Sequence, residues 1–180
     1  MATIPPKLIF DPYAPVPARM SKADRARLQD LRDAYQASMR ASLPKTSIRT
    51  PEQMAEFIAP FIAHHAVETL AVVGLNTRSR VIDAPVIISR GDVDGTEAGP
   101  RPVLRAVLVL EATTFIVAHN HPTGDASHSP ADLAVTRRLI AGGRAVDCDL
   151  VDHIILGRAG DGRFQIYSLR REHPDLWSAT

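Results

Sequence analysis

Two histidines separated by a single residue follow an apolar run in the second half of the chain. The run Phe115–Ala118 leads directly into His119, Asn120 and His121. In an extended strand successive side chains point to opposite faces, so His119 and His121 share a face and Asn120 takes the other. Two imidazoles at one strand end can bind a metal ion, although histidines in such a place are more often only hydrogen-bonded. The pair alone leaves both interpretations open.

A helix start follows the two histidines after a short polar loop. Ser129 is a favoured N-cap residue, Pro130 suits the first helical position, and Asp132 stands three residues after the cap. Helix capping alone explains these residues. If the loop folds back, however, the carboxylate of Asp132 also reaches the histidine pair.

The resulting set of donor atoms favours zinc. Two neutral imidazoles and one carboxylate leave a fourth position for water, as catalytic rather than structural zinc sites require. Bound zinc lowers the pKa of water to about 7, which predicts hydrolysis at neutral pH. Cys148 is the only cysteine, so the sequence contains neither an internal disulfide framework nor a cysteine zinc cluster.

The order and spacing of these residues resemble a known motif. His119, His121, Ser129 and Asp132 form the pattern H-x-H, seven residues, S, two residues, D, which is similar to the zinc motif of the JAMM (MPN/JAB) metalloprotease superfamily. The longer stretches AHNHPTGD, SPADLAVTRRL and VDHIILG resemble its bacterial RadC branch. The resemblance covers Pro51–Leu169.

The resemblance implies a role for each motif residue. His119, His121 and Asp132 would bind Zn²⁺, and Ser129 would support the tetrahedral intermediate of the reaction. A glutamate upstream would act as general acid and base.

The upstream glutamate has two candidates. Glu68 opens the apolar run Thr69–Leu75, and the glutamate of the family likewise stands at the start of its first core strand, which makes Glu68 the first candidate. Glu111 is the rival, because it lies close upstream of His119, although at the end of an expected helix.

Two functions from different classes remain at this point. The resemblance implies a JAMM-type zinc metallopeptidase that hydrolyses peptide or isopeptide bonds and acts on a protein substrate, such as a ubiquitin-like protein in a conjugate or its C-terminal tail. The alternative is a DNA-repair-associated RadC-type factor whose zinc site is secondary or vestigial. The formal net charge of +1 and the lack of a long basic block disfavour nucleic-acid binding.

The alternation of strand and helix patterns predicts an α/β (α+β) fold. The resemblance adds a JAB/MPN-like, cytidine-deaminase-like architecture, in which helices flank a mixed central sheet. Strands are expected at 68–75, 81–89, 115–118, 151–157 and 164–169, and helices at 101–112 and 129–141, the last one stopped by Gly142 and Gly143.

The chain is expected to consist of three parts: a proline-rich arm with an amphipathic helix at 1–49, the JAMM/RadC-like domain at 50–171 and a tail at 172–180. Ser21 caps the expected helix, whose apolar stripe includes Leu28, Leu31 and Tyr35. This stripe would pack on the domain, on a second copy of the chain in a homodimer, or on another protein. The sequence contains no signal peptide or membrane span, which predicts a cytoplasmic protein.

Further polar residues near the motif are expected to lie outside the zinc ligand set. Asp152 and His153 interrupt an apolar stretch and belong to the resemblance, so we expect them to form hydrogen bonds near the site rather than to bind zinc. His128 is expected to be an exposed loop residue, and His64 and His65 to lie at a helix end.

Overall fold

The computed structural model describes Ile4 and residues 16–41, 43, 47–91, 99–158 and 164–178. The chain forms two compact units, Met1–Leu43 and Pro44–Thr180, and each is described by itself. Most of the acidic glycine-containing segment that follows Gly91 lies outside the described residues.

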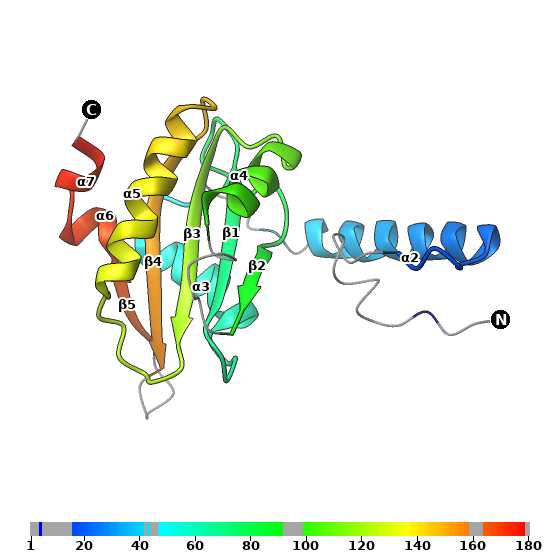
Figure 1. The fold of residues 1–180 in the computed structure, drawn as a ribbon, viewed down its shortest axis with the longest axis horizontal. Coiled ribbons are helices and arrows are strands. Elements are labelled where there is room, and N and C mark those ends of the chain that lie inside the picture. Colours follow the sequence, from blue (N-terminus) through cyan, green and yellow to red (C-terminus); the bar gives the residue numbers. More distant parts are fainter. Residues whose placement is uncertain are drawn as a thin grey trace. The chain divides into compact units, whose positions relative to one another are not determined.

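A five-stranded sheet forms the centre of the larger unit (Figure 1). Its strand order is β2-β1-β3-β4-β5, and the strands are β1 (Thr69–Leu75), β2 (Val86–Arg90), β3 (Thr114–His121), β4 (Asp149–Arg158) and β5 (Phe164–Ser168). β3 and β4 are parallel, whereas the other neighbouring pairs are antiparallel. The sheet is therefore mixed, as predicted.

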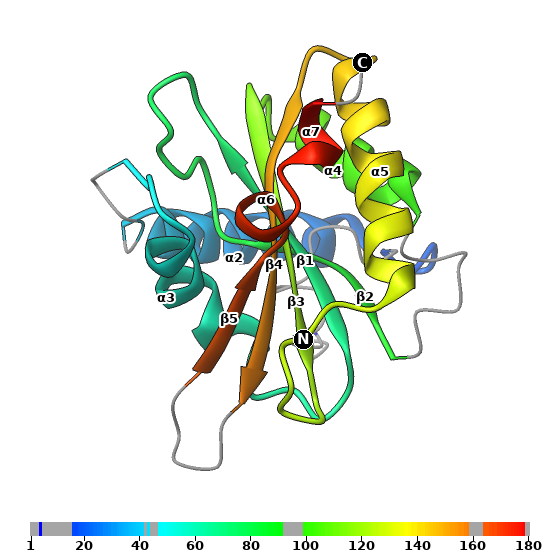
Figure 2. The ribbon, with the colours of Figure 1, turned by 90° about the vertical axis from the view of Figure 1, so that its left-hand side faces the viewer.

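Helices cover both faces of this sheet. They are α3 (Pro51–Ile62), α4 (Pro100–Val109), α5 (Pro130–Arg144), α6 (Leu169–Glu172) and α7 (Asp175–Ser178). Figure 2, a view along the sheet, shows α3 on one face and α4 and α5 on the other. Because both faces are covered, all residues of β1 are buried, and all but Thr69 are apolar or glycine.

Two elements are at least two residues shorter than predicted. The strand predicted at 81–89 begins at Val86, and Val81 forms only an isolated bridge to Leu75. The helix predicted at 101–112 ends at Val109, and Glu111 turns the chain into β3 with a φ of 52°.

The prediction that Gly142 and Gly143 stop their helix was wrong. Both lie inside α5, which continues to Arg144. Gly143 is needed for close packing, because an ideal Cβ there would lie 2.5 Å from the backbone oxygen of Cys148. An ideal Cβ on Gly142 would lie 2.8 Å from a methyl group of the flexible Leu104 side chain.

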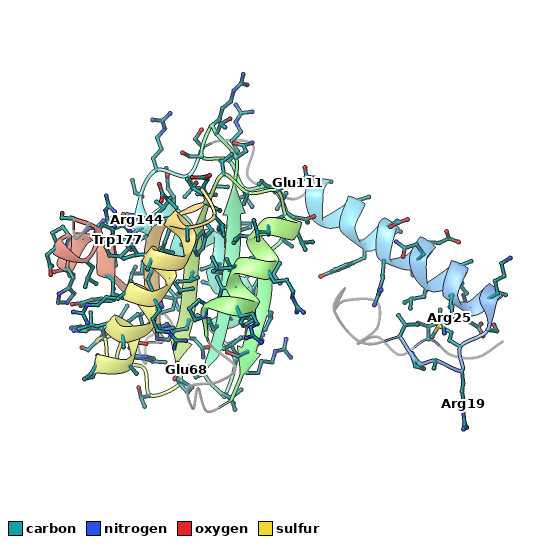
Figure 3. The ribbon with its side chains drawn as sticks, turned by 45° about the horizontal axis from the view of Figure 1, so that its top comes forward. Arg19, Arg25, Glu68, Glu111, Arg144 and Trp177 are labelled. Carbon is teal, nitrogen blue, oxygen red and sulfur yellow. The ribbon has the colours of Figure 1, made fainter. Side chains whose placement is uncertain are left out.

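The residues after 171 continue the packed structure. Leu176 in α7 is buried with the main core, and the indole N–H of Trp177 donates to the backbone oxygen of Leu150 over 2.7 Å. Arg144 of α5 donates to the backbone oxygen of Trp177; Figure 3 labels both residues. The segment predicted as a tail is thus attached to α5 and β4.

The smaller unit contains α2 (Lys22–Ala41). As predicted, Ser21 caps the helix, since its hydroxyl accepts a hydrogen bond from the backbone N–H of Asp24. Leu28 is buried in a small apolar cluster that includes Ile4 and Met20. Among the described residues, no helix is long and apolar enough to span a membrane.

Candidate metal centre

The C-terminal end of β3 carries both motif histidines. His119 and His121 lie on one face of the strand, as its alternation requires, and their Nε2 atoms are 2.9 Å apart. His119 is 1% exposed, because β1 and β4 flank β3 on its two sides. The strand therefore brings two imidazoles together as the sequence predicted.

The first turn of α5 adds a carboxylate to this pair. Ser129 and Asp132 form the predicted capping box, in which Asp132 Oδ2 accepts hydrogen bonds of 2.7 Å from both the backbone N–H and the hydroxyl of Ser129. Asp132 Oδ1 lies 3.3 Å from Nε2 of His119, and Oδ2 lies 3.9 Å from Nε2 of His121. The cap holds the carboxylate in place against the histidines.

Glu68 completes the group from the neighbouring strand. Because Leu70 pairs with His119 in the antiparallel β1–β3 ladder, the residue just before β1 lies beside the end of β3. Glu68 Oε1 is 3.9 Å from Nε2 of His119, and its side chain is 33% exposed. Single ligand atoms of Glu68, His119, His121 and Asp132 all lie within 4.8 Å of one another.

Glu111 does not belong to this cluster. It precedes β3, at the opposite end of the strand from the two histidines. Figure 3 labels Glu68 and Glu111 at opposite ends of the sheet. The geometry thus places the first candidate glutamate, and not its rival, beside the histidines.

The loop after β3 orients His121. Nδ1 of His121 lies 2.8 Å from the backbone oxygen of Asp125, and a carbonyl only accepts, so this nitrogen carries the proton. Nε2 therefore presents its lone pair to the cluster. The loop can approach because Gly157 of β4 has no side chain: a Cβ there would collide with the backbone oxygen of Gly124.

The cluster tends toward the protonation state that metal binding needs. Burial lowers the pKa of His119 well below its usual value, and the nearby His153 lowers it further, although Asp132 opposes this. Burial alone would raise the pKa of Asp132, but the neighbouring His119 and the hydrogen bonds from Ser129 lower it overall. Neutral imidazole beside carboxylate results.

These residues fit a divalent cation. The lone pair of His121 and two carboxylates lie close to Nε2 of His119. Nitrogen and carboxylate oxygen donors in this combination suit zinc among other transition metals. A bound cation would balance the two carboxylate charges.

Asp152 and His153 lie behind His119 and form hydrogen bonds, as predicted. His153 Nε2 is 2.9 Å from Nδ1 of His119. The buried carboxylate of Asp152 accepts from the backbone N–H groups of His153 and Arg170 and from the hydroxyl of Ser168. Asp152 therefore fixes the backbone of β4 at the position of His153.

Sequence reasoning missed Thr136. Its hydroxyl contacts both Nδ1 of His153 and the backbone oxygen of Asp132. Its position four residues after Asp132 places both on one face of α5, but a threonine at that spacing also occurs on ordinary buried helix faces.

The remaining histidines near the site have other partners. His128 stacks on Tyr167, with ring centroids 5.2 Å apart, and Nδ1 of His65 lies 2.9 Å from the hydroxyl of Thr69. Neither belongs to the four-residue cluster.

Comparison with known proteins matches this chain to one family. Residues 48–173 match the model of the RadC-like JAB domain. The chain is 34% identical over 125 residues to a UPF0758 protein of Symbiobacterium thermophilum, covering 69% of the chain and 53% of that protein. It is 40% identical over 133 residues to one of a Cyanothece species, covering 74% of the chain and 52% of the relative.

The chain spans about half the length of these curated relatives. A UPF0758 protein of Thioalkalivibrio sulfidiphilus is 33% identical over 139 residues, which cover 77% of the chain and 62% of the relative. The matched region contains the whole sheet, all four residues of the cluster and the hydrogen-bonded residues behind it. The chain therefore belongs to the RadC-like JAB domain family.

Proposed function

We propose that this chain is a zinc-dependent hydrolase of peptide or isopeptide bonds. The observation that supports this most is the convergence of two imidazoles, the Asp132 carboxylate and the partly exposed Glu68 carboxylate at one end of β3. His119, His121 and Asp132 would hold the ion, because their donor atoms are the most deeply placed. Bound zinc would supply a Lewis acid that makes water nucleophilic near neutral pH.

Glu68 would transfer the proton. It lies at the rim of the cluster, with its Oε1 3.9 Å from His119 Nε2 and a third of its side chain exposed, so water and substrate can reach it. Its carboxylate would accept a proton from the attacking water and pass it to the leaving amine. This two-way transfer is what hydrolysis of an amide requires.

Ser129 would stabilise the developing oxyanion. In the structure its hydroxyl donates to Asp132 Oδ2 over 2.7 Å, while its backbone N–H donates to the same oxygen. The hydroxyl would therefore have to turn from Asp132 toward the substrate during the reaction. Asp132 would keep its backbone hydrogen bond while this happens.

We propose a protein as substrate, and the superfamily resemblance suggests the C-terminal tail of a ubiquitin-like protein or its amide bond to a lysine. Zinc and Glu68 together would explain amide hydrolysis, but they do not select the amide. A panel of unstructured peptides and lysine-linked conjugates is therefore the suitable substrate set.

Metal analysis and one substitution test the proposal. Purified protein should contain about one zinc per chain, as a three-ligand site holds a single ion. Glu68→Gln should keep this zinc and lose about 100-fold or more of kcat, since general acid–base catalysis is removed. Glu111→Gln is the matched control, because Glu111 lies at the other end of β3, and it should leave both properties unchanged.

Two results would contradict the proposal. The first is a purified protein without zinc that also takes up none on titration. The second is cleavage that survives in Glu68→Gln, which would move the proton-transfer role to another residue. Salt-sensitive binding to duplex DNA without any cleavage would favour the DNA-associated alternative.

A further inference from the structure

We propose that Thr136 and His153 are positioning residues that fix the tautomer of His119, so that its Nε2 carries a lone pair before any metal arrives. The inference concerns the cluster of the proposed function and rests on that function for its biological purpose. Its physical basis is a chain of hydrogen bonds that leads from the backbone of Asp132 through Thr136 and His153 to His119.

The direction of this chain is set at Thr136. Its hydroxyl oxygen lies 2.6 Å from the backbone oxygen of Asp132. Two oxygen atoms at this distance repel each other unless a hydrogen lies between them, and a carbonyl has none to give. Thr136 must therefore donate its single hydroxyl hydrogen to Asp132.

The tautomer of His153 follows from this donation. Its Nδ1 lies 2.6 Å from the hydroxyl oxygen of Thr136, which can now only accept. Nδ1 of His153 therefore carries the proton, and Nε2 of the neutral ring keeps a lone pair. The ring is 0% exposed, and removal from water disfavours its charged form.

The last step reaches the metal ligand. His153 Nε2 lies 2.9 Å from Nδ1 of His119 and accepts, so Nδ1 of His119 carries the proton. Nε2 of His119 then presents a lone pair toward Asp132 Oδ1 at 3.3 Å and toward Nε2 of His121 at 2.9 Å. Acceptor atoms this close repel one another unless a cation lies between them, so the arrangement favours binding of a metal ion. His121 reaches the same state through the backbone oxygen of Asp125, so both imidazoles are prepared for one cation.

Burial makes this arrangement effective. Thr136 and His153 are 0% exposed and His119 is 1% exposed, so bulk water does not compete for these hydrogen bonds. This series of hydrogen bonds also begins and ends at proposed ligands, because it connects the backbone of Asp132 on α5 to the ring of His119 on β3. Through these hydrogen bonds, His153 of β4 fixes the positions of Asp132 and His119 relative to each other.

The uncharged state of His153 has a chemical consequence for His119. Metal-bound histidines commonly donate to a carboxylate or a backbone carbonyl, and a carboxylate makes the ligand more basic. Here the acceptor is an uncharged imidazole. His119 is therefore oriented without added negative charge, which preserves the Lewis acidity of a bound ion.

The test compares Thr136→Val with Thr136→Ser in the full chain. Valine has nearly the shape of threonine but no hydroxyl, whereas serine keeps the hydroxyl and loses a methyl group. Zinc affinity is measured by competition with a chromogenic chelator. Thr136→Val should weaken zinc binding by about 10-fold to 100-fold relative to Thr136→Ser, as loss of the partners behind a ligand does elsewhere.

A second readout needs no metal, and its main result comes from the wild-type protein. Long-range ¹H–¹⁵N NMR of the metal-free wild-type protein reports which ring nitrogen of each histidine carries the proton. His119 and His153 should both be protonated on Nδ1, and in Thr136→Val both should become tautomer mixtures. This measurement remains decisive if Thr136→Val folds poorly.

The inference is overturned if metal-free wild-type His119 carries its proton on Nε2, or if the folded Val and Ser variants bind zinc equally well. A wild-type protein that binds no zinc would contradict the proposed function instead. In that case the NMR measurement would still decide the tautomer.

Discussion

The side-chain oxygen of Asn120 accepts a hydrogen bond of 2.8 Å from the backbone N–H of Thr69, the residue after Glu68. The side-chain nitrogen of Asn120 donates to the backbone oxygens of His65 and Val67 on the other side of Glu68. One buried amide thus holds the backbone on both sides of the proposed proton carrier. The middle residue of the histidine motif thereby connects β3 to the start of β1.

We expect Asn120→Ala to impair hydrolysis more than zinc binding. The substitution leaves a buried backbone N–H without a partner, so the free energy of unfolding should fall by about 2 kcal/mol. Glu68 loses its fixed position, and kcat should fall by about 10-fold or more. The Kd for zinc should change by less than about threefold, because the Asn120 side chain contacts none of the proposed ligands.

Denaturant unfolding, chelator competition and steady-state kinetics on the same preparation check these three quantities. Asn76→Ala is a suitable comparison, because that asparagine holds a surface turn through Arg78 and Arg80. A parallel loss of zinc and activity in Asn120→Ala would show that the amide organises the ligands as well as Glu68.

Zinc should stabilise the folded chain. A ligand that binds only the native state adds about 4 kcal/mol at a free concentration 1,000 times its Kd. Thermal unfolding with increasing zinc should therefore show a rising Tm, and chelation should reverse it. His119→Ala should abolish the shift, whereas His128→Ala should keep it, since His128 lies in the stack with Tyr167. An equal shift in both variants would indicate nonspecific zinc binding.

Alanine at two neighbouring glycines should have different effects. An ideal Cβ on Gly143 meets the backbone oxygen of Cys148 at 2.5 Å, whereas one on Gly142 meets only a flexible methyl group of Leu104 at 2.8 Å. Gly143→Ala should cost about 2 to 4 kcal/mol of unfolding free energy, as overpacking against a backbone does. Gly142→Ala should stay within about 1 kcal/mol of wild type, because helix propensity offsets the shift of Leu104.

Urea unfolding of both variants measures this difference. Equal destabilisation would mean that α5 does not approach β4 as closely at Gly143 as described.

The glycine pair also shows where sequence reasoning fails in this chain. In the sequence two glycines after an apolar helical pattern indicate a C-terminus, yet here they allow α5 to lie against the backbone of β4. That requirement comes from a neighbour on another element. The start of α5 was predictable, because its capping box joins Ser129 and Asp132, which are only three residues apart in the sequence.

The residues of the candidate site also fall into two groups, those that local sequence patterns predict and those that only tertiary packing brings together. The alternation of a single strand places His119 and His121 together, and capping places Asp132 at a helix start, so sequence reasoning could name all three. Thr136 acts through His153, which lies 17 residues further along on another element. Only the packing of α5 against β4 brings Thr136 and His153 together, and no local sequence pattern predicts this contact.

Asp152 predicts a pH effect on stability. Burial raises the pKa of its carboxyl group, although the hydrogen bonds from Ser168, Arg170 and His153 oppose the shift. A raised folded-state pKa means that the folded chain binds the proton more tightly than the unfolded chain. This contribution to stability is fully present below the unfolded pKa of about 3.9 and is lost as pH rises through the folded value.

Asp152→Asn should remove this dependence. Its amide oxygen can still accept from the backbone N–H groups of His153 and Arg170, and its nitrogen can donate to the hydroxyl of Ser168. Relative to wild type, the variant should gain stability as pH rises from about 4 into the neutral range. Unfolding free energies of both proteins across this range test the sign. Asp152→Ala should lose about 2 to 4 kcal/mol at every pH, because the backbone N–H groups of His153 and Arg170 lose their acceptor.

Ser129→Ala separates the two roles of the Ser129 hydroxyl. As N-cap, the hydroxyl accepts from the backbone N–H of Asp132 over 3.2 Å, so alanine should cost about 1 kcal/mol of unfolding free energy. As the proposed oxyanion donor, it should contribute about 100-fold to kcat. Zinc should remain bound, because the backbone N–H of Ser129 still holds Asp132 Oδ2.

Ser129→Thr is the control for the hydroxyl, since threonine also caps helices and keeps the donor. It should retain cap stability and most of kcat, so the ratio of kcat between the Thr and Ala variants isolates the hydroxyl. If Ser129→Ala instead keeps kcat at saturating zinc but binds zinc more weakly, the hydroxyl serves only to orient the Asp132 carboxylate. The oxyanion would then depend on another donor, because Asp132 would need the Ser129 hydroxyl throughout the reaction.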